Sequence, residues 1–435
     1  MSSRDASRAW TFLEFFAGVG MAGLGLGPRW RCAFANDHDP RKLGMYAHHF
    51  GTAHLDGRDV AEVARSLSAR DDPSLLERLS GGADGGGIAR LAWASFPCQD
   101  LSLAGWRQGM SAARSGAYWP FWQILADLHR DHRRPPVVVL ENVVGMLDPE
   151  TFEGLCESLV ALDMRVGALL ADASAFVPQS RPRVFVVAVD RRVEFEGLVE
   201  ASPQHAWHGP AVQRAMAALP PSLQRAWTWW RVSPLPDPRP VSIDEVMEAH
   251  PIDVVTHEEA ATARLLSLMT DRHREKVAAA AARGGRQVGF LYRRTRNGQQ
   301  RAEVRFDGVA GCLRTPRGGS SRQTVMIVEG DAVSTRLLSG VEAARLMGME
   351  VDEDGRLTAT GRPLFPADFS YNDGYKAMGD GVAVPVVRHL ARGLLDELAA
   401  RVDALGAATT GEESASARLQ RRVQRRAQAW SDARD

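Results

Sequence analysis

The sequence predicts an α/β fold with a doubly wound, parallel sheet and a second, smaller and irregular domain. Short apolar runs alternate with helical stretches over the first 190 residues, which is the pattern of consecutive βαβ units. A glycine-rich segment directly follows the first apolar run, as it does where a strand turns into a helix beside a ligand. The alternation stops after Asp190, where prolines and tryptophans gather.

Five apolar runs are the expected strands, and two stretches between them have the spacing of helices. The run Pro-Val-Val-Val-Leu-Glu is continuously apolar, as expected for a strand buried on both faces. A further helix is expected near residues 339–349 and a last one over 381–400. The expected strands cover residues 10–16, 30–36, 91–95, 136–141 and 183–189, and the helices between them cover 118–129 and 151–162.

The chain divides into four expected parts, and its 435 residues suffice for two domains with a connecting segment. The sheet domain covers 1–190 and the smaller domain covers 191–370. Residues 371–400 are expected to return to the sheet domain, and an arginine-rich tail covers 401–435.

The composition excludes several classes of protein. No apolar run approaches the roughly 20 residues that span a bilayer, and the first residues lack the apolar core of a signal peptide. The four cysteines stand far apart with no CxxC pair, which argues against a zinc site or a disulfide framework and for a reducing cytosol. The formal net charge is zero, but residues 283–322 hold ten arginines against two acids. Such a stretch suits phosphate binding and is equally compatible with a solvated loop.

A nucleotide-type site is predicted after the first two strands. The segment from Phe16 to Gly23 contains GxGxxG, whose glycines let the backbone approach a ligand. Asp37 follows 19 residues after Gly18, at the end of the second strand, where a carboxylate can accept both ribose hydroxyls. This pair fits NAD, FAD and S-adenosylmethionine about equally. Asp59 follows a third candidate strand and suits either an adenine amino group or an ordinary turn.

A reactive thiol and a carboxyl group are predicted at the ends of two neighbouring strands. Cys98, in Pro97-Cys98-Gln99, ends the strand at 91–95, and such positions face the ligand crevice of open α/β sheets. Glu141 ends the apolar run at 136–141, and parallel strands end at one edge, so both groups lie in reach of one site as nucleophile and acid. A small buried cysteine and a glutamate paired with an arginine are the alternative explanations.

Gln179, Arg181 and Arg183 stand at alternate positions before the last strand of the sheet domain. Alternate residues of an extended chain face one way, so the three side chains are expected to reach one site. Arginines there suit a carboxylate or a phosphate. A solvated strand start explains the same pattern.

Taken together, these motifs resemble the DNA (cytosine-5) methyltransferase family of bacteria and phages. Phe-Ala-Gly-x-Gly, Pro-Cys-Gln, Glu-Asn-Val and Gln-x-Arg-x-Arg occur in the family's order, and segments 336–348 and 375–382 resemble its two later motifs. The resemblance covers roughly residues 11–190 and 305–400; the stretch 191–305 corresponds to the variable target recognition domain. Three residues depart from the pattern: Glu14 replaces Asp, Met21 replaces Gly and Asp380 replaces Asn. We expect these to change cofactor contacts locally without removing the site.

The resemblance implies a Rossmann-like methyltransferase sheet, S-adenosyl-L-methionine as cofactor and a cytosine flipped out of duplex DNA as substrate. Cys98 would attack C6, Glu141 would hold N3 and the exocyclic amine, and Arg181 and Arg183 would steady the base. No metal is implied. The implied cofactor contacts are Phe16, Ala17, Gly18, Val19, Gly20, Met21, Asp37, His38, Asp59, Val60, Pro97, Asp380, Gly381 and Val382. The implied substrate contacts are Gln99, Ser102, Asn142, Gln179, Arg317 and Arg322, with further phosphate and groove contacts from the arginines and tryptophans of 205–322.

The implied partners are double-stranded DNA and a cognate restriction or defence-system protein, with no membrane. The resemblance also implies a monomer that acts in the cytoplasm, at the nucleoid. Three other functions are compatible with parts of the sequence: a tRNA cytosine-5 methyltransferase, a silent DNA-binding regulatory subunit, and an NAD-dependent oxidoreductase. The intact Cys98, Glu141 and arginine pair argue against the silent subunit, and Pro-Cys-Gln argues against the oxidoreductase.

Overall fold

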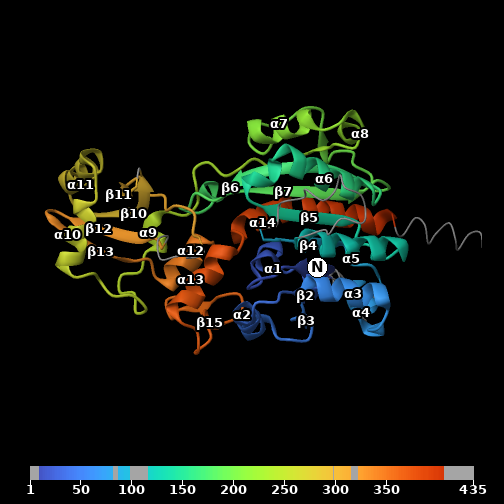
Figure 1. Ribbon diagram of the computed structural model, residues 1–435, viewed down its shortest axis with the longest axis horizontal. Coiled ribbons are helices and arrows are strands. Elements are labelled where there is room, and N and C mark those ends of the chain that lie inside the picture. Colours follow the sequence, from blue (N-terminus) through green and yellow to red (C-terminus); the bar gives the residue numbers. More distant parts are fainter. Residues whose placement is uncertain (1–8, 82–86, 98–115, 297, 315–321, 406–435) are drawn as a thin grey trace, which may run out of the picture.

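A seven-stranded sheet forms the larger lobe of the computed structural model, which describes residues 9–81, 87–97, 116–296, 298–314 and 322–405 (Figure 1). The strand order is β3-β2-β1-β4-β5-β7-β6. The α/β fold class is therefore confirmed. The strands are β1 (Trp10–Phe15), β2 (Trp30–Asn36), β3 (Leu55–Asp56), β4 (Leu91–Ala94), β5 (Val137–Asn142), β6 (Met164–Asp172) and β7 (Pro182–Asp190).

The sheet is mixed, which corrects the expectation of an all-parallel arrangement. The strands β1 to β5 run parallel, whereas β7 is antiparallel to both β5 and β6. Only nine residues, 173–181, join β6 to β7, and a parallel crossover needs about a dozen or more. The strand β6 was not expected, because its Ala-Leu-Leu-Ala core consists of strong helix formers.

Helices cover both faces of this sheet. Alternate residues of β5 divide between them: Val137 and Val139 pack with α1 and α14, whereas Val138 and Leu140 pack with α3, α5 and α6. This alternation explains the continuous apolar run, since both faces of the strand are buried. The helices are α1 (Met21–Leu26), α2 (Pro40–Phe50), α3 (Val60–Ala69), α4 (Pro73–Leu79), α5 (Tyr118–Arg130) and α6 (Pro149–Val160), with short 3-10 turns at Val144–Leu147 and Ala173–Ala175.

The strand order reverses between β1 and β4. The chain proceeds from β1 outward to β2 and β3, and then returns to the other side of β1 with β4 and β5. Ligands of open α/β sheets bind outside the carboxyl ends of the strands at such a switch point. The glycine-rich loop after β1 and Pro97 after β4 flank this point.

Residues 199–230 pack against the large sheet, which differs from the expectation that the smaller domain begins at 191. The indole Nε1 of Trp230 donates to the carbonyl of Val187 at 3.0 Å, and the amide of Thr228 donates to Val166 at 2.8 Å. Tryptophans bury the largest apolar area when they lie on the sheet. Trp207 and Trp230 are fully buried there, so neither is available for groove contacts. The elements are β8 (Val199–Glu200), α7 (Pro210–Ala218), α8 (Pro221–Gln224) and β9 (Trp229–Trp230).

A four-stranded antiparallel sheet forms the smaller lobe, in the order β11-β10-β12-β13. Helices α10 and α11 cover one of its faces through a separate small core. Figure 1 shows this lobe well apart from the large sheet. Its elements are α9 (Ile243–Val246), α10 (Glu259–Ser267), α11 (Asp271–Arg283), β10 (Arg286–Arg296), β11 (Gln299–Arg305), β12 (Thr324–Glu329) and β13 (Ala332–Leu337).

The C-terminal helices connect the two lobes. Figure 1 shows α12 and α13 between them, and α14 packs on α1. The expected helix at 381–400 begins at Val384, includes a π-helical turn at Ala391–Leu395, and continues to residue 405. Among the described residues, no helix combines the length and the apolar character that a membrane span requires. The remaining elements are α12 (Gly340–Leu346), β14 (Arg356–Leu357), β15 (Arg362–Pro363), α13 (Tyr371–Asp380) and α14 (Val384–Leu390).

Candidate active site

The loop after β1 leaves room for a ligand at the switch point. Gly18 has φ 58°, and no atom lies within 4 Å of the position that a Cβ would take there. Its amide donates a hydrogen bond to Oδ2 of Asp37 at 2.9 Å. Phe16, which is half-buried, also has a positive φ of 56°. Four other residues that the sequence predicts as cofactor contacts are buried: Ala17, Val19, Gly20 and Met21.

The acids predicted after β2 and β3 reach the same edge of the sheet. Asp37 is half-buried, and its Oδ1 accepts from the amide of Asp39 at 2.9 Å. Asp59 is exposed and caps α3 through the amide of Ala61 at 2.8 Å, while Val60 is buried and His38 is exposed. The carboxylate of Asp37 thus lies against the glycine loop, with lone pairs left for hydroxyl groups.

The end of α13 closes this side of the site. Gly381 lies so near the glycine loop that a Cβ there would be 2.2 Å from the sulfur of Met21. Asp380 forms an ion pair with Lys42 of α2 at 2.9 Å. Burial lowers the pKa of Lys42, but Asp380 and Asp37 more than offset this and raise it above its ordinary value. Two of the three departures from the family pattern are therefore close together, because Met21 packs against Gly381 and Asp380 directly precedes it. The neighbouring Val382 is buried.

Glu14, the third departure, is buried in β1 behind the glycine loop. Burial raises its pKa from 4.5 to about 8, although the amides of Gly23 and Ala22 oppose the shift. Its Oε2 has no hydrogen-bond partner within the described ranges. The carboxyl group therefore keeps its proton to a higher pH than an ordinary glutamate does.

Glu14→Gln is expected to remove a pH dependence of stability. The folded carboxyl keeps its proton up to about pH 8, whereas the unfolded one loses it above about pH 4.5. The contribution of Glu14 to the free energy of unfolding is therefore fully present below about pH 4.5 and is lost as the pH rises to about 8. The loss amounts to a few kcal/mol. Urea unfolding at pH 5 and pH 8 should show Glu14→Gln gaining on the unsubstituted protein at pH 8. An equal difference at both pH values would contradict the assignment.

On the other side of the switch point, Asn142 holds the backbone that leads to Cys98. Its Nδ2 donates to the carbonyl of Phe96 at 2.9 Å, and its Oδ1 accepts from Val143 at 2.8 Å. Each end of this amide holds a backbone group and keeps one further donor or acceptor, so the predicted contact of Asn142 with the substrate stays a prediction. Pro97 is exposed. Cys98, Gln99 and Ser102, together with the loop 100–109, lie outside the described residues.

Glu141 and Arg183 form an ion pair at this edge. The Arg183 Nε lies 3.1 Å from Glu141 Oε1, and the two side chains are 14% and 8% exposed. The antiparallel course of β7 places its start beside the end of β5, where Glu141 is opposite Phe185 and Asn142 is opposite Val184. The two side chains are therefore close because β7 runs antiparallel to β5, whereas a parallel strand was expected.

Gln179 and Arg181 are both buried and use their side chains on groups of the protein, and their predicted contacts with the substrate stay predictions. Gln179 is fully buried; its Nε2 donates to Leu346 and its Oε1 accepts from Leu313. Arg181 is 2% exposed, and burial lowers its pKa to about 10, helped by the nearby Arg183. Its guanidinium donates to backbone carbonyls and, through Nη1, to Cys312 Sγ at 3.4 Å. Because β7 begins only at Pro182, the alternation of a strand does not extend back to Gln179 and Arg181.

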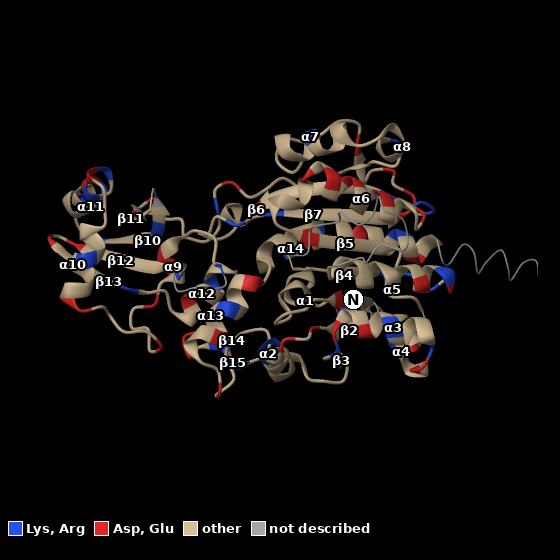
Figure 2. Cartoon of the chain, in the orientation of Figure 1, with Lys and Arg blue, Asp and Glu red and all other residues tan. Residues whose placement is uncertain are grey.

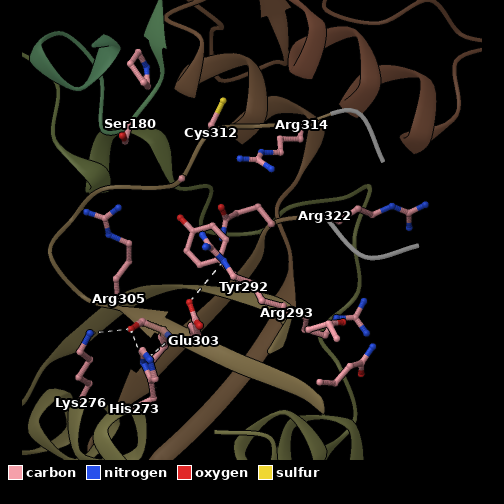
Figure 3. A pocket seen from close by; sticks show the side chains of 17 residues that line it. Ser180, His273, Lys276, Tyr292, Arg293, Glu303, Arg305, Cys312, Arg314 and Arg322 are labelled. Atoms are coloured by element: carbon pink, nitrogen blue, oxygen red, sulfur yellow. Dashed lines mark hydrogen bonds and ion pairs between the residues drawn. The ribbon is translucent and has the colours of Figure 1, made fainter. Parts of the chain in front are cut away.

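A cavity of about 790 Å³ lies between the start of β7 and the smaller sheet. Figure 3 shows side chains from β10, β11 and the 311–314 segment around it, and Figure 2 shows basic residues on β10 and α11. The predicted contact Arg322 lines it, whereas Arg317 lies outside the described residues. Cations therefore predominate on its walls: Lys276, Arg293, Arg294, Arg305, Arg314 and Arg322.

Two charged residues near this edge of the sheet were missed from the sequence. Lys42 neutralises Asp380, and its signal was its rarity, because lysine occurs only at 42, 276 and 376. Asp56, at the end of β3, pairs with Arg58 at 2.6 Å and Arg78 at 3.1 Å. No group of three or more potential metal ligands occurs in the part of the chain that the structure describes.

The family comparison agrees with this arrangement. The model of the family described as C-5 cytosine-specific DNA methylase matches residues 10–396, so the chain belongs to this family. The curated relatives and the solved structures described below are methyltransferases by name.

Individual relatives are distant and match in part. Type II methyltransferase M.MspI of Moraxella sp is 26% identical over 200 residues, 44% of this chain and 42% of the relative. Type II methyltransferase M.HpaII of Haemophilus parainfluenzae is 26% identical over 195 residues, covering 43% and 48%. The chain thus spans less than half the length of these relatives.

Two solved structures share the fold. S. pombe Dnmt2 methyltransferase has a TM-score of 0.51 at 15% identity, covering 90% of this chain and 99% of that one. Entamoeba histolytica methyltransferase EhMeth has a TM-score of 0.53 at 12% identity, with the same coverage.

Proposed function

We propose that this protein transfers a methyl group from S-adenosyl-L-methionine to C5 of cytosine in a specific sequence of double-stranded DNA. One observation carries the proposal. The Glu141–Arg183 pair lies at the carboxyl end of β5. The next residue of β5, Asn142, donates a hydrogen bond to the carbonyl of Phe96, which is two residues before Cys98. A carboxyl group and the backbone that leads to a thiol are thus fixed to one another.

The cytosine must leave the duplex stack to reach this edge, at a cost of a few kcal/mol. The Cys98 thiolate adds to C6, which makes C5 nucleophilic, while Glu141 holds N3 and the exocyclic amine so that charge does not build up in the ring. Arg183 keeps the Glu141 carboxyl in place. After C5 has gained the methyl group, a base, such as water, removes the C5 proton, and the bond from Cys98 to C6 breaks.

The switch-point residues fit the proposed cofactor. The open space beside Gly18 admits a ligand close to the backbone, and the Asp37 carboxylate offers acceptors to ribose hydroxyls. Asp59 suits the adenine amino group. The cofactor supplies a methyl group on a positively charged sulfur. Lys42 offsets the charge of Asp380 where the family pattern has a neutral residue.

The cation-lined cavity supports a nucleic-acid substrate, because side chains of this kind neutralise phosphates. The curated relatives are named type II methyltransferases, which supports DNA and a place in restriction–modification or another phage-defence system. The protein partner, the monomeric state and a place at the nucleoid stay predictions.

Methyl transfer from labelled cofactor to unmethylated duplex DNA tests the proposal. We expect label in DNA, none with Cys98→Ala, and 5-methylcytosine at one repeated sequence when the product is mapped at base resolution. Transfer to tRNA in place of DNA would assign the other substrate. Cofactor binding without transfer to either nucleic acid would indicate a silent regulatory subunit, and failure to bind the cofactor would revive the oxidoreductase.

A further inference from the structure

We propose that the β10–β11 ribbon reads the major groove of the DNA and that Glu303 and Arg294 on it read one G·C base pair. This inference rests on the proposed function and concerns the recognition sequence, which the activity alone leaves open. The major groove is wide enough for a two-stranded β-ribbon.

Beyond Phe290, one face of the ribbon is polar, and the opposite face is buried at its base. Tyr292 is paired with Glu303 across the two strands, and Arg294 is paired with Arg301. Side chains alternate along a strand, so these residues share one face with Arg305. The alternate positions include Leu291, Ala302 and Val304, which pack into the small core beneath α10 and α11.

The polar face is turned toward the cavity. Tyr292 lies against the backbone of Gly311, where a Cβ would be 2.1 Å from the tyrosine hydroxyl oxygen. The Arg294 guanidinium lies 5.7 Å from the centre of the Tyr292 ring. Its Nε is 3.6 Å from the carboxylate of Glu303, which is 26% exposed. Figure 3 shows Tyr292 and Glu303 side by side in this cavity.

Glu303 is the one acidic side chain among the described residues that line the cavity, against six arginines and lysines. A carboxylate on such a surface repels DNA phosphates, so its place there favours a base-edge donor over the backbone. The cytosine N4 amine is the donor that Glu accepts from in the major groove, and Arg donates to guanine O6 and N7. A neighbouring Arg and Glu therefore match both halves of one G·C pair.

Glu303→Gln tests this assignment. Glutamine prefers adenine to cytosine in the major groove. The preference for G·C over other base pairs should therefore fall by about ten- to a hundredfold at one position of the methylated sequence, other than the target cytosine. Glu303→Asp keeps the charge but shortens the side chain, and it should relax the same position. The readout is a base-resolution map of methylation on a randomised duplex library, with both variants and the unsubstituted protein.

Glu329→Gln is the matched control. Glu329 faces Arg286 across β12 and β10, with 3.7 Å between Arg286 Nε and Glu329 Oε1, and it does not line the cavity. The Glu329→Gln variant should methylate the same sequence as the unsubstituted protein. An unchanged sequence in both Glu303 variants, or an equal gain of affinity for all sequences, would overturn the proposal and leave the methyltransferase function standing. If the unsubstituted protein transfers no methyl group to DNA, both proposals fail.

Discussion

Glu141→Gln is expected to lower the rate of methyl transfer by about 10²–10⁴-fold and to leave cofactor binding unchanged. The amide has the shape of the carboxyl group but can neither give up nor accept a full proton at N3 of the cytosine. Glu141 is 8% exposed and its Oε1 lies 3.1 Å from Arg183, so its side chain is already oriented before the base arrives. Single-turnover transfer with saturating DNA and cofactor measures the chemical step.

The control for this variant is Glu150→Gln, an exposed glutamate in the first turn of α6. It should transfer at the unsubstituted rate. Cofactor affinity measured by calorimetry should be the same in all three proteins. A Glu141→Gln enzyme that retains its full rate would show that another group holds N3.

The positions of the site residues were predictable because parallel strands end together. The loop after β1, Asp37 after β2 and the turn after β4 required only the recognition of short strands, and all of these lie at one edge. The Glu141–Arg183 pair was not predicted, because a glutamate paired with an arginine was only the alternative to a catalytic acid and its partner had no name. Its arginine reaches the edge because β7 runs antiparallel and begins there.

The contacts that the sequence did not predict arise where tertiary packing overrides local pattern. Asn142 and Gln179 are polar residues beside catalytic motifs, but each spends its side chain on a buried backbone group. A buried carbonyl without a donor is costly, and no sequence pattern shows which carbonyls will be buried. The same applies to Trp207 and Trp230, whose indole groups donate to carbonyls within the large lobe.

Arg181→Met is expected to lower the free energy of unfolding by about 3–5 kcal/mol, which is among the largest effects of a single substitution. The Arg181 guanidinium donates to Leu313 at 3.0 Å, to Gly379 at 2.9 Å and to Gly381 at 2.5 Å. Methionine fills much of the space but donates nothing, so these carbonyls are left without a partner. The substitution thus loosens the start of β7 from both the 311–314 segment and the end of α13.

Urea unfolding of Arg181→Met measures this loss, and Arg191→Met is its control. Arg191 is 57% exposed and pairs with Asp163 at the surface, so its removal should change stability by less than about 1 kcal/mol. Because Gly381 packs on Met21, Arg181→Met should also weaken cofactor binding, although Arg181 lies outside the cofactor loops. Equal stability of the two variants would mean that water replaces the guanidinium. In that case Arg181 would not be what joins the 311–314 segment to the end of α13.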